Sequence, residues 1–397
     1  MKILFISRGT PSSRDPQWGS FELDQAKALR NYGHDVVLLS VDRRFRRYYR
    51  KHGITMKVID GIYCYNSFYL SAAVTNIISP KLTDFIRNKQ IERLFNKVIK
   101  KFGFPDIVYG HYLPNSCLAV YLKNKYGIPA VGIEHWSKMG QKDLTPLVYN
   151  QAKQTYPCLD ALVSVSTDLK RMIKQNLGIE SYVVNNMLGD GFDYVDNMHK
   201  GIINFVSTGN LLPIKGFDVL IEAFSLLSRP KDSWHLNIIG SGKEKENLQK
   251  QIEDCDLQNN IKLLGRLQKS DVISNLQASD VFIVSSHTET FGVAALEALA
   301  CGLPVISTEC GGPRDFITKE NGKFCKVNDP QSLSDAIDDM FEHIDDYDRK
   351  AISEDVHSRF SGKAISQQLT SIFESVVNKQ GFAPCAILIW ISLADTR

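Results

Sequence analysis

Residues 285–317 read SSHTETFGVAALEALACGLPVISTECGGPRDFI, and this stretch decides the fold. It follows the apolar run VFIV at 281–284 and includes a second apolar run, PVIS, at 304–307. Between the runs, the residues from about Phe291 onward favour a helix. A strand, a loop, a helix and another strand in this order predict two parallel, neighbouring strands of an α/β domain.

Two glutamates bracket the start of this predicted helix. Glu289 lies in the preceding loop, and Glu297 falls in the second turn, from where its side chain leans back toward the helix N-terminus. The N–H groups of residues 292–294 lack helical partners and form an anion site, which Gly292 lets a ligand approach closely. Because two carboxylates repel a bare phosphate, the arrangement favours a ligand with both phosphate and hydroxyl groups, such as a sugar nucleotide. A buried helix with a solvated glutamate has the same spacing and remains the alternative.

The same stretch resembles the donor-site signature of the retaining glycosyltransferases of family 4, group 1. The shared features are the glutamate pair with Phe291-Gly292 inside it, the run EALACGLPVI at 297–306, and the turn Gly311-Gly312-Pro313. The resemblance extends over nearly the whole chain, to about Lys379. It implies the GT-B fold, in which two Rossmann-like α/β domains face a central cleft.

We expect four segments on this basis. Residues 1–190 form an N-terminal Rossmann-like acceptor domain, and residues 200–360 form a C-terminal Rossmann-like domain that binds the nucleotide-sugar donor. Residues 361–379 form a helix that crosses back to the first domain, as in the family. Residues 380–397 form a tail of unknown role, with an apolar run too short to span a bilayer.

Polar residues follow two predicted strands of the first domain, and open α/β sheets bind ligands at these carboxyl ends. His111 follows one strand, and Glu134 and His135 follow the next. The resemblance implies that His111 faces the sugar in the cleft and that Glu134 and His135 are further cleft or acceptor residues. Gly19 matches a cleft loop in which the family usually has two glycines.

The second domain carries the residues that the resemblance assigns to the donor. Lys215 matches a lysine that grips the donor diphosphate, whereas Asn210 occupies the position of the usual arginine, for which Arg266 or Arg314 could compensate. At the border between the domains, Asn185 replaces the proline of the family's Pro-Asn pair. The complete predicted donor site consists of Asn210, Lys215, Gly240, Arg266, Leu267, Glu289, Phe291, Gly292, Val293 and Glu297.

The resemblance also implies a mechanism with retention at the anomeric carbon. Lys215 and the amides at the helix start stabilise the departing diphosphate, Glu297 holds ribose hydroxyls, and Glu289 holds sugar hydroxyls. The predicted catalytic residues are Glu289, Lys215 and His111. No metal and no cofactor are implied beyond the substrate, a UDP- or GDP-linked sugar. The acceptor is a glycan or a lipid-linked oligosaccharide, as in cell-surface polysaccharide synthesis.

Composition predicts a cytoplasmic protein, since we find no signal peptide, no long apolar span and no cysteine pair with disulfide or zinc spacing. Residues 1–200 hold 28 Lys and Arg against 17 Asp and Glu, a net charge of +11, and the rest of the chain carries −8. The basic and aromatic run at 42–51, with Arg43, Arg44, Arg46 and Arg47, favours peripheral contact with an anionic membrane. It lacks a stacking motif for nucleic acid.

A second basic helix is predicted at 81–101, and we expect its apolar residues, from Leu82 and Phe85 to Ile99, in the core. Two rival functions stay open. One is a sugar-nucleotide epimerase of the same architecture, which needs no acceptor. The other is a donor-binding, non-catalytic partner subunit, which the missing arginine at Asn210 allows.

Overall fold

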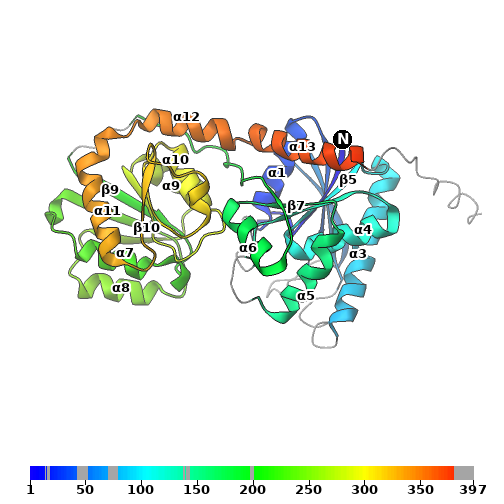
Figure 1. Ribbon diagram of the computed structural model, residues 1–397, viewed down its shortest axis with the longest axis horizontal. Helices are drawn as coiled ribbons and strands as arrows, with labels where there is room; N and C mark the ends of the chain where they lie inside the picture. The colour runs from blue at the N-terminus through cyan, green and yellow to red at the C-terminus, as the bar shows by residue number, and fades with distance from the viewer. Residues whose placement is uncertain are drawn as a thin grey trace, which may run out of the picture.

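The computed structural model describes residues 1–13, 15, 18–42, 52–69, 79–136, 139, 144–196 and 201–379. They form two α/β domains, each built on its own parallel sheet, which lie next to one another (Figure 1). The fold is therefore the GT-B arrangement predicted from the sequence. The predicted basic run, including Arg43 to Arg47, and the tail at 380–397 lie outside the described residues.

The N-terminal domain has an eight-stranded sheet in the order β3-β4-β2-β1-β5-β6-β7-β8. All neighbouring strands are parallel except β3 and β4, which form an antiparallel pair at one edge. The strands are β1 (Lys2–Ser7), β2 (Asp35–Val41), β3 (Gly53–Ile59), β4 (Ile62–Phe68), β5 (Ile107–His111), β6 (Ala130–Glu134), β7 (Ala161–Ser164) and β8 (Tyr182–Val183). The helices are α1 (Ser20–Asn31), α3 (Pro80–Phe102), α4 (Tyr112–Tyr126), α5 (Pro146–Thr155) and α6 (Thr167–Leu177).

The C-terminal domain has a six-stranded parallel sheet in the order β11-β10-β9-β12-β13-β14. Its strands are β9 (Ile203–Thr208), β10 (Trp234–Ile239), β11 (Ile261–Gly265), β12 (Val281–Val284), β13 (Val305–Thr308) and β14 (Gly322–Cys325). Its helices are α7 (Phe217–Ser225), α8 (Lys245–Asp254), α9 (Lys269–Gln277), α10 (Val293–Ala300) and α11 (Pro330–His343).

The decisive stretch folds as predicted. β12 and β13 are parallel neighbours, with Ile283 paired to Ile306, and α10 connects them. Both strands are fully buried because helices cover both faces of a parallel sheet, which explains their continuous apolar runs.

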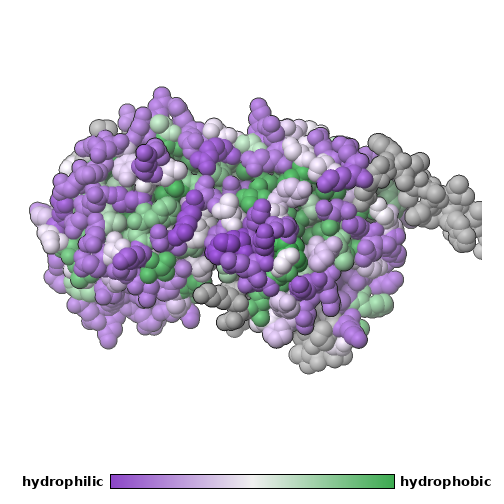
Figure 2. Space-filling view, in the orientation of Figure 1, coloured by the Kyte–Doolittle hydropathy of each residue, from purple (hydrophilic) through white to green (hydrophobic). Residues whose placement is uncertain are grey.

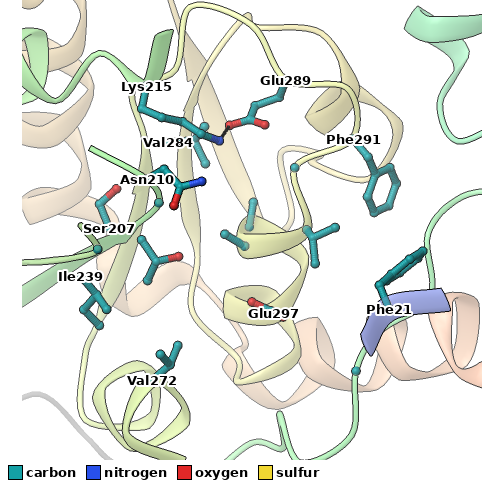
Figure 3. Close-up of a pocket in the computed structure, with 18 of the residues that line it drawn as sticks. Phe21, Ser207, Asn210, Lys215, Ile239, Val272, Val284, Glu289, Phe291 and Glu297 are labelled. Atoms are coloured by element: carbon teal, nitrogen blue, oxygen red, sulfur yellow. Dashed lines mark hydrogen bonds and ion pairs between the residues drawn. The ribbon is translucent and has the colours of Figure 1, made fainter. Parts of the chain in front are cut away.

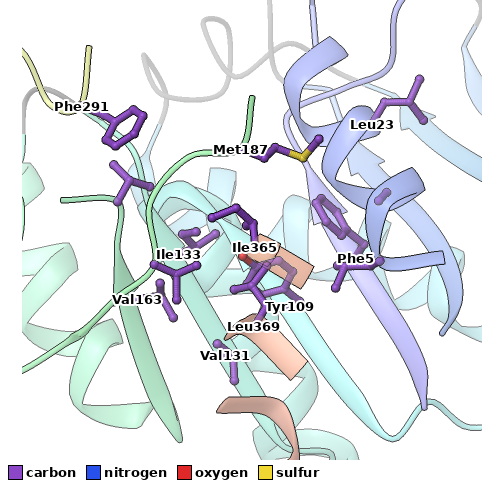
Figure 4. Close-up of a cluster of buried hydrophobic side chains, with 14 of the residues drawn as sticks. Phe5, Leu23, Tyr109, Val131, Ile133, Val163, Met187, Phe291, Ile365 and Leu369 are labelled. Carbon is purple, nitrogen blue, oxygen red and sulfur yellow. The ribbon is translucent and has the colours of Figure 1, made fainter. Parts of the chain in front are cut away.

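Two helices carry the chain back from the second domain to the first. α12 (Arg349–Phe360) packs on α10, and α13 (Gly362–Lys379) packs on α1 (Figure 1). The ring of Phe373 lies 5.0 Å from that of Tyr109, and Thr370 Oγ1 lies 2.8 Å from His34 Nε2. Figure 4 shows Ile365 and Leu369 among core residues of the first domain, so this helix completes that core.

The basic helix α3 differs from the prediction at its start. Ile91, Leu94, Phe95 and Val98 are buried as expected, but Leu82 is 36% and Phe85 60% exposed. A helix of 23 residues is about 34 Å long, roughly twice the length of the five-residue strand β5, so its first turns extend beyond the sheet.

Most of the surface in Figure 2 is hydrophilic, with smaller groups of hydrophobic residues. Within the described ranges, no helix combines the length and the apolar character that a membrane span requires.

Candidate active site

A cleft of about 1280 Å³ opens where the carboxyl ends of the two sheets face each other. Its C-terminal wall comes from the loops after β9, β10, β11 and β12 and from the start of α10. Its N-terminal wall comes from α1, the start of α4, and the loop after β6. All ten predicted donor residues line this cleft. The structure therefore brings together residues from 210 to 297.

The start of α10 forms the floor of the site (Figure 3). Gly292 is the residue before the helix and has φ +94°, a conformation that glycine adopts without strain. The first helical hydrogen bond is donated by Ala295 to the Gly292 carbonyl, so the N–H groups of Val293 and Ala294 precede it. Both residues line the cleft, where these N–H groups can bind an anion.

Glu289 is held against this helix start by the following glycine turn. Its N–H donates to the Cys310 carbonyl over 2.7 Å, and Gly312 N–H donates to its carbonyl over 2.9 Å. A Cβ on Gly312 would lie 2.3 Å from the Phe291 Cα, so only glycine permits this approach. The Gly311-Gly312 pair of the sequence signature thus positions the backbone of Glu289.

The carboxylate of Glu289 forms an ion pair and a hydrogen bond within the cleft. Lys215 Nζ lies 2.5 Å from its Oε1, and Ser286 Oγ donates to the same oxygen over 2.7 Å. Figure 3 shows the ion pair crossing the upper end of the cleft. Because Lys215 lies in the loop after β9, the pair joins two separate segments of the C-terminal domain.

Glu297 lies one helical turn deeper than Ala294 and also faces the cleft. Burial raises the pKa of its carboxyl group to about 7, although nearby Lys269 opposes the shift. Within the described residues, nothing donates a hydrogen bond to this carboxyl group. The two glutamates therefore differ: Glu289 is ion-paired, whereas Glu297 has its hydrogen-bonding capacity free for a ligand.

Asn210 lies at the carboxyl end of β9 and also faces the cleft (Figure 3). Its loop packs closely on the next one, because a Cβ on Gly240 would lie 1.8 Å from the Gly209 carbonyl oxygen. Arg266 lines the cleft and Arg314 does not; Arg314 is ion-paired with Glu309 at 3.2 Å. Of the two arginines considered as substitutes, only Arg266 is in place.

Phe291 contributes to the cleft wall mainly through its backbone. Its side chain is 2% exposed, and its ring centroid lies 5.0 Å from that of Phe316 and 6.2 Å from that of Phe360. The phenyl ring therefore anchors the loop at 285–292, between β12 and α10, in the core. We call this loop the donor loop.

The structure does not place His111 at the cleft surface, which corrects the prediction that it faces the sugar. Residues two apart share one face of a strand, and the rings of Tyr109 and His111 both pack against Phe5 of the neighbouring strand. The His111 ring is fully buried and stacks 4.3 Å from Phe5 and 5.1 Å from His135. Burial and the neighbouring His135 hold its pKa well below the usual value.

His135 is the histidine that lines the cleft. Its Nδ1 lies 2.9 Å from the amide oxygen of Asn186, which can only accept, so Nδ1 carries the proton and Nε2 has a free lone pair. Burial lowers its pKa to about 3, and the imidazole is neutral at physiological pH. Its Nε2 is buried and has no hydrogen-bond partner among the described residues.

Glu134 and Gly19 do not line the cleft, in contrast to the prediction. The Glu134 carboxylate is buried and accepts four hydrogen bonds, from Tyr156 Oη and from the N–H groups of Leu113, His135 and Trp136. Its role here is to brace the cleft loop. Gly19 has φ +74°, and a Cβ on it would lie 2.2 Å from the Gly9 carbonyl oxygen, so its backbone packs closely against that of Gly9.

The cleft also contains residues that were not predicted from the sequence, among them Ser286, Lys269, Phe21 and Asn186. Ser286 follows the carboxyl end of β12, where the rule for open sheets would have indicated it. Lys269 and Phe21 line the cleft from the starts of α9 and α1. Asn186 also lines it and orients His135, a contact that no sequence pattern indicates.

Two family models match the chain, one in each domain. The model of the family described as "Glycosyl transferases group 1" matches residues 197–354, and that of "Glycosyltransferase Family 4" matches residues 22–188. An uncharacterized glycosyltransferase of Methanocaldococcus jannaschii is 30% identical over 257 residues, which cover 62% of this chain and 68% of that protein. The putative teichuronic acid biosynthesis glycosyltransferase TuaC of Bacillus subtilis is 24% identical, covering 86% of this chain and 90% of TuaC.

Solved structures share the fold at low identity. Sucrose-phosphate synthase from Thermosynechococcus elongatus superimposes with a TM-score of 0.76 at 16% identity, covering 96% of this chain and all of that one. HepE of Anabaena, solved in complex with UDP and glucose, superimposes with a TM-score of 0.67 at 18% identity, covering 94% of this chain and all of that one.

Proposed function

The chain belongs to the family 4, group 1 glycosyltransferases, and on this premise we propose that it transfers a sugar from a nucleotide-diphosphate donor to a glycan or lipid-linked acceptor. The observation that carries the proposal is the joint placement of Glu289, Glu297 and Lys215 around the free N–H groups of α10. Two carboxylates beside an anion site and a cation match a ligand that has both hydroxyls and phosphates.

The donor diphosphate would bind the Val293 and Ala294 amides and Lys215. The ribose hydroxyls would donate to Glu297, whose carboxyl group is free to accept them. These donor contacts come from the C-terminal domain, with Arg266 and Lys269 as further cations along the cleft. Binding requires the Lys215–Glu289 pair to separate or widen, because a phosphate oxygen and Glu289 then compete for the same ammonium group.

We propose transfer with retention of the anomeric configuration. The bond between the anomeric carbon and the diphosphate oxygen breaks, and its electron pair leaves with the nucleoside diphosphate. The acceptor oxygen bonds to the anomeric carbon on the same face, and its proton passes to the departing phosphate. Lys215 and the helix amides stabilise the charge that grows on the diphosphate, so the proposal requires no metal ion.

Glu289 and His135 would act on the sugar itself. Once released from Lys215, Glu289 accepts sugar hydroxyls and stabilises the electron-poor ring, and Ser286 keeps its carboxylate in place. His135 lines the opposite wall, where its ring would pack against the sugar. His111 supports the His135 ring from behind through their stacking contact.

A UDP- or GDP-linked hexose or N-acetylhexosamine is the proposed donor. The complex of HepE with UDP and glucose supports a UDP-sugar, and the TuaC relative supports a role in cell-surface polysaccharide synthesis. Incubation with a panel of UDP- and GDP-sugars, with nucleotide release measured, tests this. Isomerised free sugar nucleotide would instead indicate the epimerase, and tight binding without turnover would indicate the non-catalytic partner subunit.

We also propose a cytoplasmic location with peripheral contact to an anionic membrane. The exposed Phe85 and Leu82 lie at the start of α3, and Lys81, Lys89 and Arg93 are exposed on the same helix. Aromatic and basic residues together suit the interface of a charged bilayer. Flotation with phosphatidylglycerol vesicles should recover the wild type, whereas equal recovery of a Phe85→Ser/Lys89→Ser variant would reject this surface.

A further inference from the structure

The two domains meet beside the donor loop through one carboxylate of the C-terminal domain. Asp315, which follows the Gly311-Gly312 turn, accepts a hydrogen bond over 2.8 Å from Thr167 N–H at the start of α6. Its Oδ2 also accepts over 3.0 Å from Asn185 Nδ2 in the N-terminal domain. One residue away, Ser166 Oγ donates to the Thr290 carbonyl over 2.6 Å.

On the side of the C-terminal domain, this contact is coupled to Glu289. The turn that leads to Asp315 forms a parallel bridge in which Gly311 pairs with Glu289. The two backbone hydrogen bonds that flank the bridge, of 2.7 and 2.9 Å, fix the turn to the donor loop. Movement of Asp315 would therefore move the backbone of Glu289.

On the side of the N-terminal domain, the contact is coupled to His135. Asn185 is followed directly by Asn186, whose amide oxygen holds His135 Nδ1 at 2.9 Å. Asn185 Nδ2 also donates to the Val165 carbonyl over 3.0 Å, which fixes this segment next to β7. Two adjacent asparagines thus contact the donor domain with one side chain and the cleft imidazole with the other.

We propose that Asn185 is a positioning residue that holds the donor loop at a fixed position relative to His135 across the cleft. The family resemblance places a proline at this position, and a proline side chain has no hydrogen-bond donor. Asparagine adds a charge-assisted bond to Asp315, of the kind that is stronger than a neutral one. The proposed donor contacts come from the C-terminal domain alone. A shift of the donor loop relative to His135 should therefore affect the transfer step and leave nucleotide affinity unchanged.

The proposal rests on the proposed function, and its test separates turnover from binding. Asn185→Ala should lower kcat for sugar transfer by roughly tenfold to 100-fold, the loss expected for one hydrogen bond to a charged group, with the Kd for the nucleotide within twofold of wild type. Asn185→Asp should lower kcat further, because two carboxylates then face each other.

Asn247→Ala is the matched control, since Asn247 donates to the Glu244 carboxylate over 2.9 Å on exposed α8. An unchanged kcat in Asn185→Ala, or a nucleotide Kd that rises as much as kcat falls, would overturn the proposal. Imidazole ¹⁵N NMR of His135 gives a readout without turnover: its shifts should change in Asn185→Ala and not in Asn247→Ala. If the wild type transfers no sugar from any donor, the proposed function fails, and the NMR comparison still decides the role of Asn185.

Discussion

Lys215 Nζ lies 2.5 Å from Glu289 Oε1, so the proposed diphosphate-binding cation is paired with the proposed sugar-binding carboxylate. The pair keeps two partly buried charges compensated until a donor arrives. A donor supplies phosphate oxygens for Lys215 and hydroxyls for Glu289, and each charge then gains a partner of its own. The first prediction follows from this exchange.

Replacing Lys215 by methionine should lower kcat by about 100-fold, because a charge that stabilises the departing diphosphate is lost. The Kd for the nucleotide should increase as well, since a phosphate-binding cation is lost and Glu289 becomes an unpaired anion near the phosphates. Steady-state transfer assays and calorimetric nucleotide titration measure the two effects. Lys243→Met, at an exposed lysine near the same cleft, is the control. A kcat within twofold of wild type would remove Lys215 from the mechanism.

Nucleotide affinity should increase as pH rises from 6 to 8. Burial raises the pKa of Glu297 to about 7, so the carboxyl group ionises in this window, and the ionised form accepts both ribose hydroxyls. Binding of a ribonucleoside diphosphate, titrated at several pH values, measures the trend. Glu297→Gln should flatten the profile and weaken binding by about tenfold. A pH slope that survives this substitution would assign the ionisation to another group.

The stability of the empty protein should change in the opposite direction. The folded-state pKa of Glu297 lies above its unfolded value, so the folded state binds more protons between about pH 4.5 and 7. This group therefore contributes stability at low pH, and the contribution is lost as pH rises through about 7. Thermal unfolding of wild type and Glu297→Gln across this range should show the wild type losing more stability. Parallel curves for the two proteins would contradict the shift.

Asn210→Arg should tighten nucleotide binding by about tenfold. The position faces the diphosphate side of the cleft, and an arginine there would add a charge-assisted, bidentate contact that the amide of Asn210 cannot make. Titration with UDP and GDP measures the gain, and uridine and guanosine, which lack phosphates, serve as control ligands. A gain that is equal for nucleoside and nucleotide would show that the new side chain does not reach the diphosphate.

The sequence predicted the donor wall better than the acceptor wall, and the reason is physical. Glu289, Gly292 and Glu297 belong to one strand–loop–helix unit, so local spacing fixes their relative positions. His111 and Glu134 each end a strand, and which side such a residue faces depends on packing with distant segments. For Glu134, two of the hydrogen-bond donors that hold it are Leu113 and Tyr156, both about 21 residues away in the chain. Spacing does not reveal such partners.

The sequence pattern indicated His111 as the cleft histidine, whereas the structure places His135 there. Substitution of each histidine tests which of the two acts in transfer. His111→Phe should retain transfer within about threefold of wild type and should not destabilise the protein, because the ring packs on Phe5 and neither ring nitrogen has a partner among the described residues. His135→Phe should lower kcat by at least tenfold, since the hydrogen bond to Asn186 that orients this ring at the cleft is lost. Paired transfer assays and thermal unfolding curves measure both variants. If His111→Phe is the inactive variant at unchanged stability, then His111 contacts the sugar and the cleft must open further during turnover than this structure shows.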